Sequence, residues 1–235
     1  MLDTEFLTIL GLGLVLGLRH ALDSDHLAAV STILAQRPSF RASGMIGFSW
    51  GLGHTAVLLV VGTVVLVLRV SIPESVALAA EFGVGAMLVF LGAVLTVRLV
   101  RERWHVHRHD HDDEQHLHLH SHALVEDHGH GHWWRDSIRP FGIGMVHGLA
   151  GSAALLLIVL SSARSVSEGL IYIVVFGIGS IVGMVLVGMV VSLPVLWSLN
   201  LGRPAFLAVQ GLASAGSVAI GLMMMFQIAF GGQLF

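Results

Sequence analysis

The chain has 235 residues, of which 55% are hydrophobic and only 11% charged, and its mean hydropathy is +0.84. These values lie outside the range of soluble globular domains and are typical of a membrane protein with several spans. A formal net charge of −3 argues against nucleic acid as a partner. The absence of cysteine excludes disulfides and thiolate metal sites.

Six apolar runs each reach the length of about 20 residues that a membrane-spanning helix needs. We therefore expect an all-α membrane protein of six transmembrane helices. The five prolines fall at or near the ends of the runs, where helices are expected to stop. The runs cover roughly residues 5–36, 43–68, 75–99, 138–162, 167–193 and 205–231.

The first run is too long for one straight span and carries the segment H-A-L-D-S-D-H at 20–26. We expect a long first helix that breaks near these residues. An Asp or Arg at the centre of a membrane helix costs about 2.5–3.5 kcal/mol, so such a cluster indicates function. Imidazole and carboxylate groups suit a divalent first-row metal such as nickel or cobalt. An internal ion network between Arg19 and Asp23 is the alternative. The candidate ligands are His20, Asp23, Asp25 and His26.

Two further histidines lie inside apolar runs. His54 follows W-G-L-G in the second run, and His147 lies in G-M-V-H-G-L in the fourth. Each is a candidate ligand or pathway residue, and a hydrogen bond to a neighbouring helix is the alternative for each. The flanking glycines would let another helix come close.

A faint internal repeat relates the two halves of the chain. G-L-R-H-A-L at 17–22 aligns with G-M-V-H-G-L at 144–149, and W-G-L-G at 50–53 aligns with F-G-I-G at 176–179 at nearly the same offset. Because each half holds three spans, the second half must run inverted. Inverted repeats with a site near the midplane are typical of secondary transporters. We divide the chain into a first three-helix repeat (1–100), a loop (101–137) and a second repeat (138–235).

The loop is a low-complexity segment in which histidine alternates with acidic residues, and we expect it to be disordered without metal. It offers secondary sites that would buffer or deliver metal ions without being essential for transport; the alternative is a solvated linker. Its eleven histidines are His105, His107, His109, His111, His116, His118, His120, His122, His128, His130 and His132.

Arginine placement predicts the orientation in a bacterial-type inner or plasma membrane. Arginine is concentrated on the cytoplasmic side of membrane proteins. The richer side would therefore face the cytoplasm together with the His-rich loop, which leaves both termini outside. The two arginines on the outer side are Arg69 and Arg164. The nine on the cytoplasmic side are Arg37, Arg41, Arg98, Arg101, Arg103, Arg108, Arg135, Arg139 and Arg203.

R-H-A-L-D-S-D-H at 19–26 closely resembles the signature of the nickel/cobalt transporter (NiCoT-type) family, which consists of a histidine, four intervening residues, an acid and a second histidine. The resemblance implies a metal-binding role for His20, Asp25 and His26. G-L-G-H-T at 51–55 is similar to the second family motif and implies that His54 is functional. G-M-V-H-G-L-A-G-S at 144–152 and the His-rich loop are more similar to a shorter six-span branch of urease-accessory or nickel-cobalt efflux-like proteins.

We therefore expect a transporter of Ni²⁺ or Co²⁺ as substrate, not an enzyme, with no organic cofactor. The ion would bind the His and Asp side chains near the bilayer midplane. Because no nucleotide-binding motif is present, the energy would come from a gradient or from a partner. Acid should weaken binding, since imidazoles must be neutral to ligate, and protons are a candidate coupling ion. A second copy or a metallochaperone are candidate partners. Direction of transport and metal preference stay open.

The alternatives are an intramembrane zinc-dependent hydrolase, a bis-histidine haem protein, and a metal-binding accessory membrane subunit for metalloenzyme maturation. A hydrolase would need a water activated by the metal and a separate general base. The sequence contains no H-E-x-x-H motif and names no such base.

Overall fold

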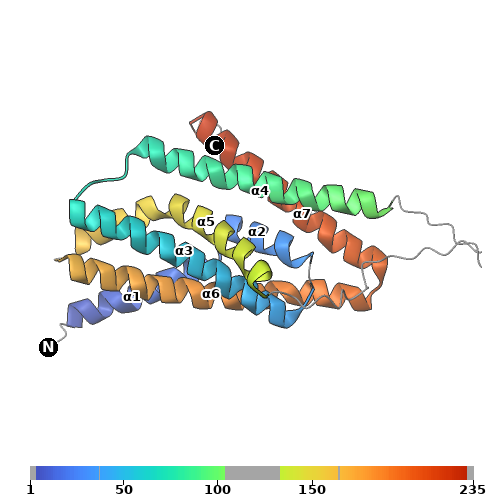
Figure 1. Ribbon diagram of the computed structural model, residues 1–235, viewed down its shortest axis with the longest axis horizontal. Coiled ribbons are helices and arrows are strands. Elements are labelled where there is room, and N and C mark those ends of the chain that lie inside the picture. The colour runs from blue at the N-terminus through green and yellow to red at the C-terminus, as the bar shows by residue number, and fades with distance from the viewer. Residues whose placement is uncertain (1–3, 37, 104–132, 164, 232–235) are drawn as a thin grey trace, which may run out of the picture.

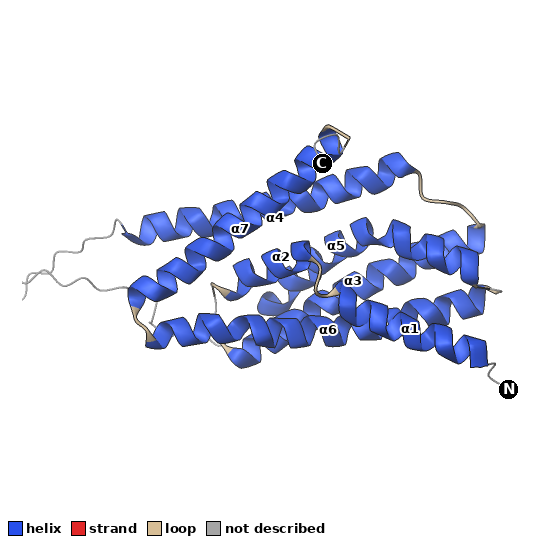
Figure 2. Ribbon diagram, turned by 180° about the vertical axis from the view of Figure 1, so that it is seen from behind, coloured by secondary structure: helices blue, strands red, loops and turns tan. Residues whose placement is uncertain are grey.

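The computed structural model describes residues 4–36, 38–103, 133–163 and 165–231, and the elements in these ranges are helices (Figures 1 and 2). The expected all-α class is confirmed. In chain order the helices are α1 (Thr4–His20), α2 (Ser24–Leu34), α3 (Phe40–Leu68), α4 (Glu74–Arg103), α5 (Trp133–Ser162), α6 (Val166–Asn200) and α7 (Arg203–Ala229).

Local sequence explains where several helices begin. Ser39 and Ser165 precede α3 and α6 in extended conformations, and each hydroxyl accepts a hydrogen bond from a backbone N–H of the first turn. A helix leaves these first N–H groups without an internal partner, so a serine at this position stabilises its start. α7 starts with Gly202 at φ 95°, a conformation that glycine adopts readily, followed by Pro204 in the first turn.

The first predicted span consists of two helices, α1 and α2, separated by residues 21–23. The break expected near residues 20–26 is therefore confirmed. Two backbone hydrogen bonds close the connection as a tight turn: Leu22 N–H donates to the Arg19 carbonyl and Asp23 N–H to that of His20, at 2.9 and 3.1 Å. Asp23 then begins the second helix, because its own carbonyl accepts from Leu27 N–H.

The helices form two groups (Figures 1 and 2). α3 and α6 pack against each other, while α5 packs on α3 and α1 packs on α6. α4 and α7 cross as a second pair, and α2 contacts α4, α6 and α7. Figure 2 shows the turn between α1 and α2 beside α3 and α5, which places the polar segment inside the first group.

Four helices in the described part of the chain are long and apolar enough to cross a membrane: α3, α4, α6 and α7. The chain is therefore an integral membrane protein. α1 has 17 residues, which at a rise of about 1.5 Å per residue is shorter than a hydrocarbon core of about 30 Å. α1 alone is therefore too short to cross it.

Two expectations about helix ends need correction. Pro140 and Pro194 lie inside α5 and α6 rather than at their ends, because α5 begins at Trp133 and α6 continues to Asn200. α5 includes the polar residues 135–137 before Pro140, and α6 continues for six residues after Pro194. α4 likewise runs to Arg103, so the predicted loop 101–137 is shortened at both ends. Its remaining residues, 104–132, which carry all eleven loop histidines, lie outside the described residues.

Candidate metal centre

The turn between α1 and α2 brings His20 and His26 together. His20 is the last residue of α1 and His26 lies in the first turn of α2, yet their ring centroids are only 4.6 Å apart. On one continuous helix the six-residue spacing would separate them along the axis by about 9 Å at 1.5 Å per residue. The helix break therefore creates the pair.

His54 and His147 reach the same place from two other helices. His54 in α3 is fully buried, and its ring centroid lies 4.9 Å from that of His20 and 5.6 Å from that of His26. His147 in α5 is also buried, with its ring 4.7 Å from His26. The four histidines that the sequence places in apolar runs thus meet in one cluster.

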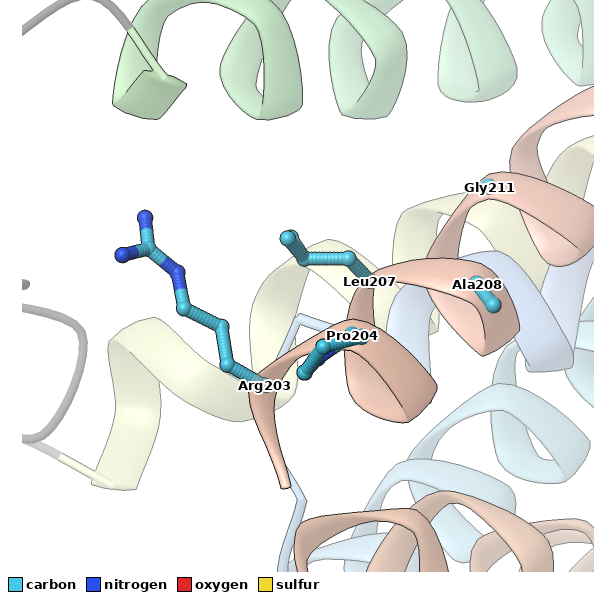
Figure 3. A pocket seen from close by; sticks show the side chains of 5 residues that line it. All are labelled: Arg203, Pro204, Leu207, Ala208 and Gly211. Atoms are coloured by element: carbon cyan, nitrogen blue, oxygen red, sulfur yellow. The ribbon is translucent and has the colours of Figure 1, made fainter. Parts of the chain in front are cut away.

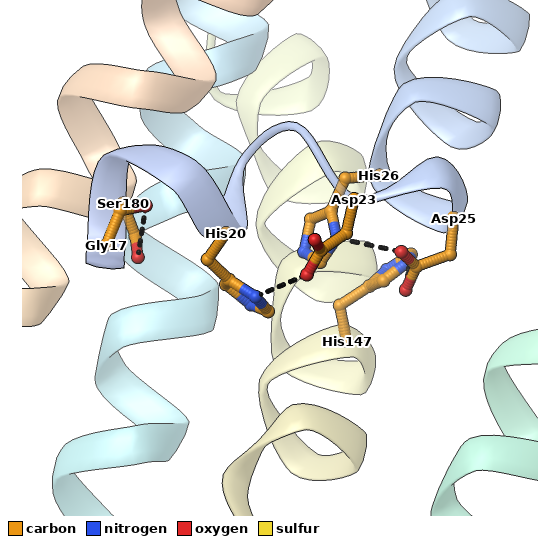
Figure 4. Close-up of polar contacts among 7 residues, drawn as sticks. All are labelled: Gly17, His20, Asp23, Asp25, His26, His147 and Ser180. Carbon is orange, nitrogen blue, oxygen red and sulfur yellow. Dashed lines mark hydrogen bonds and ion pairs between the residues drawn. The ribbon is translucent and has the colours of Figure 1, made fainter. Parts of the chain in front are cut away.

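The two carboxylates of the segment hold imidazole rings in place (Figure 4). His20 Nδ1 donates to Asp23 Oδ2 at 2.8 Å, and His26 Nδ1 donates to Asp25 Oδ1 at 3.2 Å. The alternative of an Arg19–Asp23 network is not what the structure contains, since Asp23 pairs with His20. A carboxylate on one ring nitrogen fixes the tautomer and leaves the lone pair on the other nitrogen, an arrangement common around bound metals.

Several imidazole nitrogens in the cluster are buried without a hydrogen-bond partner: Nε2 of His26, both ring nitrogens of His54, and Nε2 of His147. His147 Nδ1 lies 3.3 Å from the carbonyl oxygen of Ile143, which can only accept, so the proton is on Nδ1 and Nε2 carries the lone pair. Each buried polar group left unpaired costs about 1–3 kcal/mol. A cluster of them is the arrangement expected where a ligand supplies the missing partner.

Sequence reasoning missed Trp50 as a site residue. This side chain is fully buried and its ring stacks near His26 and His147, with centroids 6.0 and 5.0 Å away. The available signal was its spacing four residues before His54, which places both on one face of α3. The predicted repeat aligns Trp50 with Phe176, and the Phe176 ring lies 5.6 Å from His20. Both of these aromatic residues therefore pack against the imidazole cluster.

This donor set defines the chemistry available. Imidazole nitrogens and carboxylate oxygens without thiolates suit divalent nickel, cobalt, copper and zinc rather than the oxygen-preferring magnesium and calcium. Ligand atoms gather in two groups, one formed by His20, His26 and His54 and the other by Asp25, His26 and His147, with the atoms of each group within 4.8 Å of one another. The cluster can therefore take up a first-row transition-metal ion.

A hollow at the start of α7 is lined by Arg203, Pro204, Leu207, Ala208 and Gly211 (Figure 3). None of these residues belongs to the histidine cluster, and they bring no carboxylate or imidazole ligand. The hollow therefore adds nothing to the metal chemistry.

Comparison with known proteins covers nearly the whole described chain. The family model of NicO, described as a high-affinity nickel-transport protein, matches residues 6–231. The chain is also similar to the urease accessory protein UreH of Bacillus sp. (strain TB-90), with 34% identity over 216 residues that cover 90% of this chain and 89% of the relative. No solved structure matches the chain.

Proposed function

We propose that this chain, which belongs to the NicO family of high-affinity nickel-transport proteins, moves Ni²⁺ or Co²⁺ across the membrane through its histidine cluster. The family assignment confirms the resemblance to nickel transporters drawn from residues 19–26. The observation that carries the proposal is the convergence of four imidazoles from α1, α2, α3 and α5, several with unpaired nitrogens. The six proposed site residues are His20, Asp23, Asp25, His26, His54 and His147.

The position of the cluster along the helices supports a site near the bilayer midplane. His54 lies at the centre of α3 (Phe40–Leu68), and His147 at the centre of α5 (Trp133–Ser162). The last turn of α1 also lies near the middle of the bundle. There the Ser180 hydroxyl, near the centre of α6, donates a hydrogen bond to the carbonyl oxygen of Gly17 (Figure 4). A site halfway along membrane-spanning helices is reached equally from both sides, as alternating access requires.

Six spans arranged as two inverted repeats account for the packing. α1 packs on α6 as α5 packs on α3. A Cβ atom on Gly17 would lie 2.1 Å from the carbonyl oxygen of Phe176, and one on Gly144 would lie 2.1 Å from that of Trp50. The predicted repeat aligns Gly17 with Gly144 and Phe176 with Trp50, so it relates these two close approaches to each other.

A second pair of contacts supports the same relation. A Cβ atom on Gly53 would lie 2.1 Å from the carbonyl oxygen of Phe141, and one on Gly179 would lie 2.3 Å from that of Leu14. Gly53 and Gly179 are aligned in the repeat, and Leu14 and Phe141 precede the aligned segments by the same number of residues. We divide the chain accordingly into two repeats joined by the His-rich segment.

The orientation follows from arginine. The end of α4, the start of α5 and the connection between α6 and α7 lie at one end of the bundle in Figure 1. Arginines are concentrated there, among them Arg98, Arg101, Arg139 and Arg203. The positive-inside rule assigns that end to the cytoplasm and both termini to the outside. Residues 104–132 then face the cytoplasm, where their histidines would buffer ions or exchange them with a metallochaperone.

In the proposed cycle the ion exchanges water ligands for imidazoles at the cluster. Asp23 and Asp25 supply two negative charges that offset the charge of the ion, which lowers the cost of holding it inside the membrane. Movement down a gradient supplies the energy. The name of the UreH relative favours one other candidate function, an accessory subunit that binds nickel for urease maturation without transporting it.

Metal flux into liposomes that contain this chain alone separates the two functions. We expect the wild-type protein to move radiolabelled nickel, and His26→Ala to abolish movement while the protein remains in the membrane. Ser217→Ala is the control, because this equally buried hydroxyl bonds to the Leu88 carbonyl between α4 and α7, away from the cluster. Nickel binding without flux in the wild type would favour the accessory function. Flux at the wild-type rate in His26→Ala would overturn the site assignment.

A further inference from the structure

The ligand atoms of the cluster are not gathered around one point. Among the described residues they form two sets of three, and His26 belongs to both. His20 and His54 complete the first set, and Asp25 and His147 complete the second. The ring contacts agree with this division, because His20 and His54 lie against each other at 4.9 Å, whereas His147 lies against His26 and Trp50.

Each set has the dimensions of a metal site. Ligand atoms on opposite sides of an ion, each about 2.1 Å from it, are separated by about 4.2 Å. The atoms within each set lie within 4.8 Å of one another, so small side-chain adjustments would close either set around an ion. No set of three joins His147 to His20 or His54 in the described part of the chain, so one ion cannot contact all of these residues without a larger rearrangement.

We propose that the transported ion occupies two alternating positions that share His26 as a common ligand, and passes from one to the other without returning to bulk water. This inference rests on the proposed transport function and deepens it. In the first position the ion is held by His20, His26 and His54, and in the second by Asp25, His26 and His147.

Each position has one partly exposed ligand and is otherwise buried. The first adjoins the exposed turn between α1 and α2, where the side chain of Asp23 is 53% exposed and that of its partner His20 is 19% exposed. At the second, the side chain of Asp25 is 22% exposed and that of His147 is 1% exposed. Figure 4 shows His20 on one side of His26, and Asp25 beside His147 on the other. Each position therefore has an edge at which an ion can enter or leave, and the buried His26 joins the two.

Each position also has its own negative charge. Asp23 acts at the first through its hydrogen bond to His20 Nδ1, and Asp25 can bind directly at the second. An ion that moves between them is therefore never left without a nearby carboxylate, which keeps the step inexpensive in a medium of low dielectric constant.

The hydrogen bond of His26 limits occupancy to one ion. Its Nδ1 donates to Asp25 Oδ1, which leaves Nε2 as the single nitrogen with a lone pair, and this atom is buried without a partner. One lone pair binds one ion. The two positions are therefore alternatives, and the chain should hold one ion at the cluster rather than two.

Matched alanine variants test this arrangement with Co²⁺ as the probe, since its visible spectrum reports the type and number of ligands. The full chain is purified in nanodiscs with the eleven loop histidines changed to serine, so that only the cluster binds. His54→Ala removes a ligand from the first position alone, His147→Ala from the second alone, and His26→Ala from both. Ser217→Ala is the control for the substitution of a buried polar side chain.

We expect one Co²⁺ per wild-type chain, no binding by His26→Ala, and one ion of distinct spectrum in each of the other two variants. The affinity of His26→Ala for Co²⁺ should fall by more than about 100-fold. The affinities of His54→Ala and His147→Ala should fall by less than this. Both should nevertheless transport Co²⁺ into liposomes at less than about one tenth of the wild-type rate, because each lacks one of the two positions.

Other results would overturn the inference. If His54→Ala and His147→Ala lose binding as completely as His26→Ala, one shared site exists. Two Co²⁺ per wild-type chain would contradict alternating occupancy, and wild-type transport by either variant would show that its position is dispensable. Each of these results would overturn the two positions but not the proposed transport function, provided that the wild-type protein binds and moves Co²⁺. A wild-type protein that neither binds nor moves Co²⁺ overturns the proposed function itself.

Discussion

The backbone of α5 touches that of α3 at Gly144, where an added Cβ atom would lie 2.1 Å from the carbonyl oxygen of Trp50. One turn further along α5, a Cβ atom on Gly148 would lie 2.6 Å from the carbonyl oxygen of His54. These two glycines flank His147, so the depth to which this imidazole enters the cluster is set by direct contact between helix backbones. Any larger residue at either position must move α5 away from α3.

We predict that Gly144→Ala destabilises the protein and weakens metal binding. The added methyl group would push against a backbone carbonyl that cannot turn aside, and overpacking of this kind costs about 1–3 kcal/mol. Gly142→Ala is the matched control, because a Cβ atom at that position of the same helix meets nothing within 4 Å. Thermal unfolding in detergent and Co²⁺ affinity are the measurements. Equal unfolding temperatures for the two variants would contradict the close contact.

The same argument applies to the other half of the bundle. Gly17→Ala should destabilise the contact of α1 with α6, because its Cβ atom would lie 2.1 Å from the Phe176 carbonyl oxygen. Gly11→Ala, earlier in α1, meets nothing within 4 Å and should be neutral. Thermal unfolding is again the measurement. If the two halves are related by an inverted repeat, the Gly17 and Gly144 variants should lose similar stability, whereas a large difference would count against the relation.

A third prediction concerns the role of Asp23, which we assign to holding His20 rather than to direct binding. Asp23→Asn loses the charge but keeps an oxygen that accepts from His20 Nδ1, so it should raise the KM for Co²⁺ transport less than Asp23→Leu does. Asp23→Leu removes the acceptor and should raise it by about 10- to 100-fold. Initial rates of uptake into liposomes over a range of Co²⁺ concentrations provide the test. A Leu variant with the wild-type KM would exclude this role.

Much of the candidate site was predictable because charge is expensive inside a membrane. Four ionisable residues in one apolar run, His20, Asp23, Asp25 and His26, indicated both a helix break and a metal site, and the structure brings them together with the break at residues 21–23. His54 and His147 were identifiable for the same reason, as isolated imidazoles in apolar helices.

The sequence did not indicate which role each residue has at the site. All four residues of the segment were candidate ligands, whereas in the structure the Asp23 carboxylate accepts a hydrogen bond from His20. Trp50 escaped notice because a tryptophan in an apolar run is consistent with simple packing, and only the distances to His26 and His147 reveal its place. Helix ends were misjudged at Pro140 and Pro194, since hydropathy does not report how far a helix continues beyond the membrane core.

A fourth prediction addresses the eleven loop histidines, whose role stays a proposal. Changing all of them to serine should leave the maximal rate of nickel transport unchanged, because the cluster within the helices carries the ion. The amount of nickel retained by the purified protein should fall, since each imidazole pair or triplet in such a tract binds ions weakly. Flux assays and metal analysis of the same preparation measure both quantities. Loss of transport at saturating nickel would show that the segment is part of the pathway.

The last prediction uses Trp50 as a reporter of the site. Its ring lies 5.0 Å from that of His147 and 6.0 Å from that of His26, so Co²⁺ or Ni²⁺ bound to these imidazoles would lie close enough to quench its fluorescence. In the protein with serine in place of the loop histidines, titration with Co²⁺ should quench emission in proportion to occupancy of the cluster. Trp50→Phe, which keeps an aromatic ring in the same space, should remove most of this quenching. Trp197→Phe should leave it unchanged, because Trp197 is exposed and lies near the end of α6. If quenching persists in Trp50→Phe and disappears in Trp197→Phe, the ion binds away from the histidine cluster, and the contact between Trp50 and His147 has another purpose.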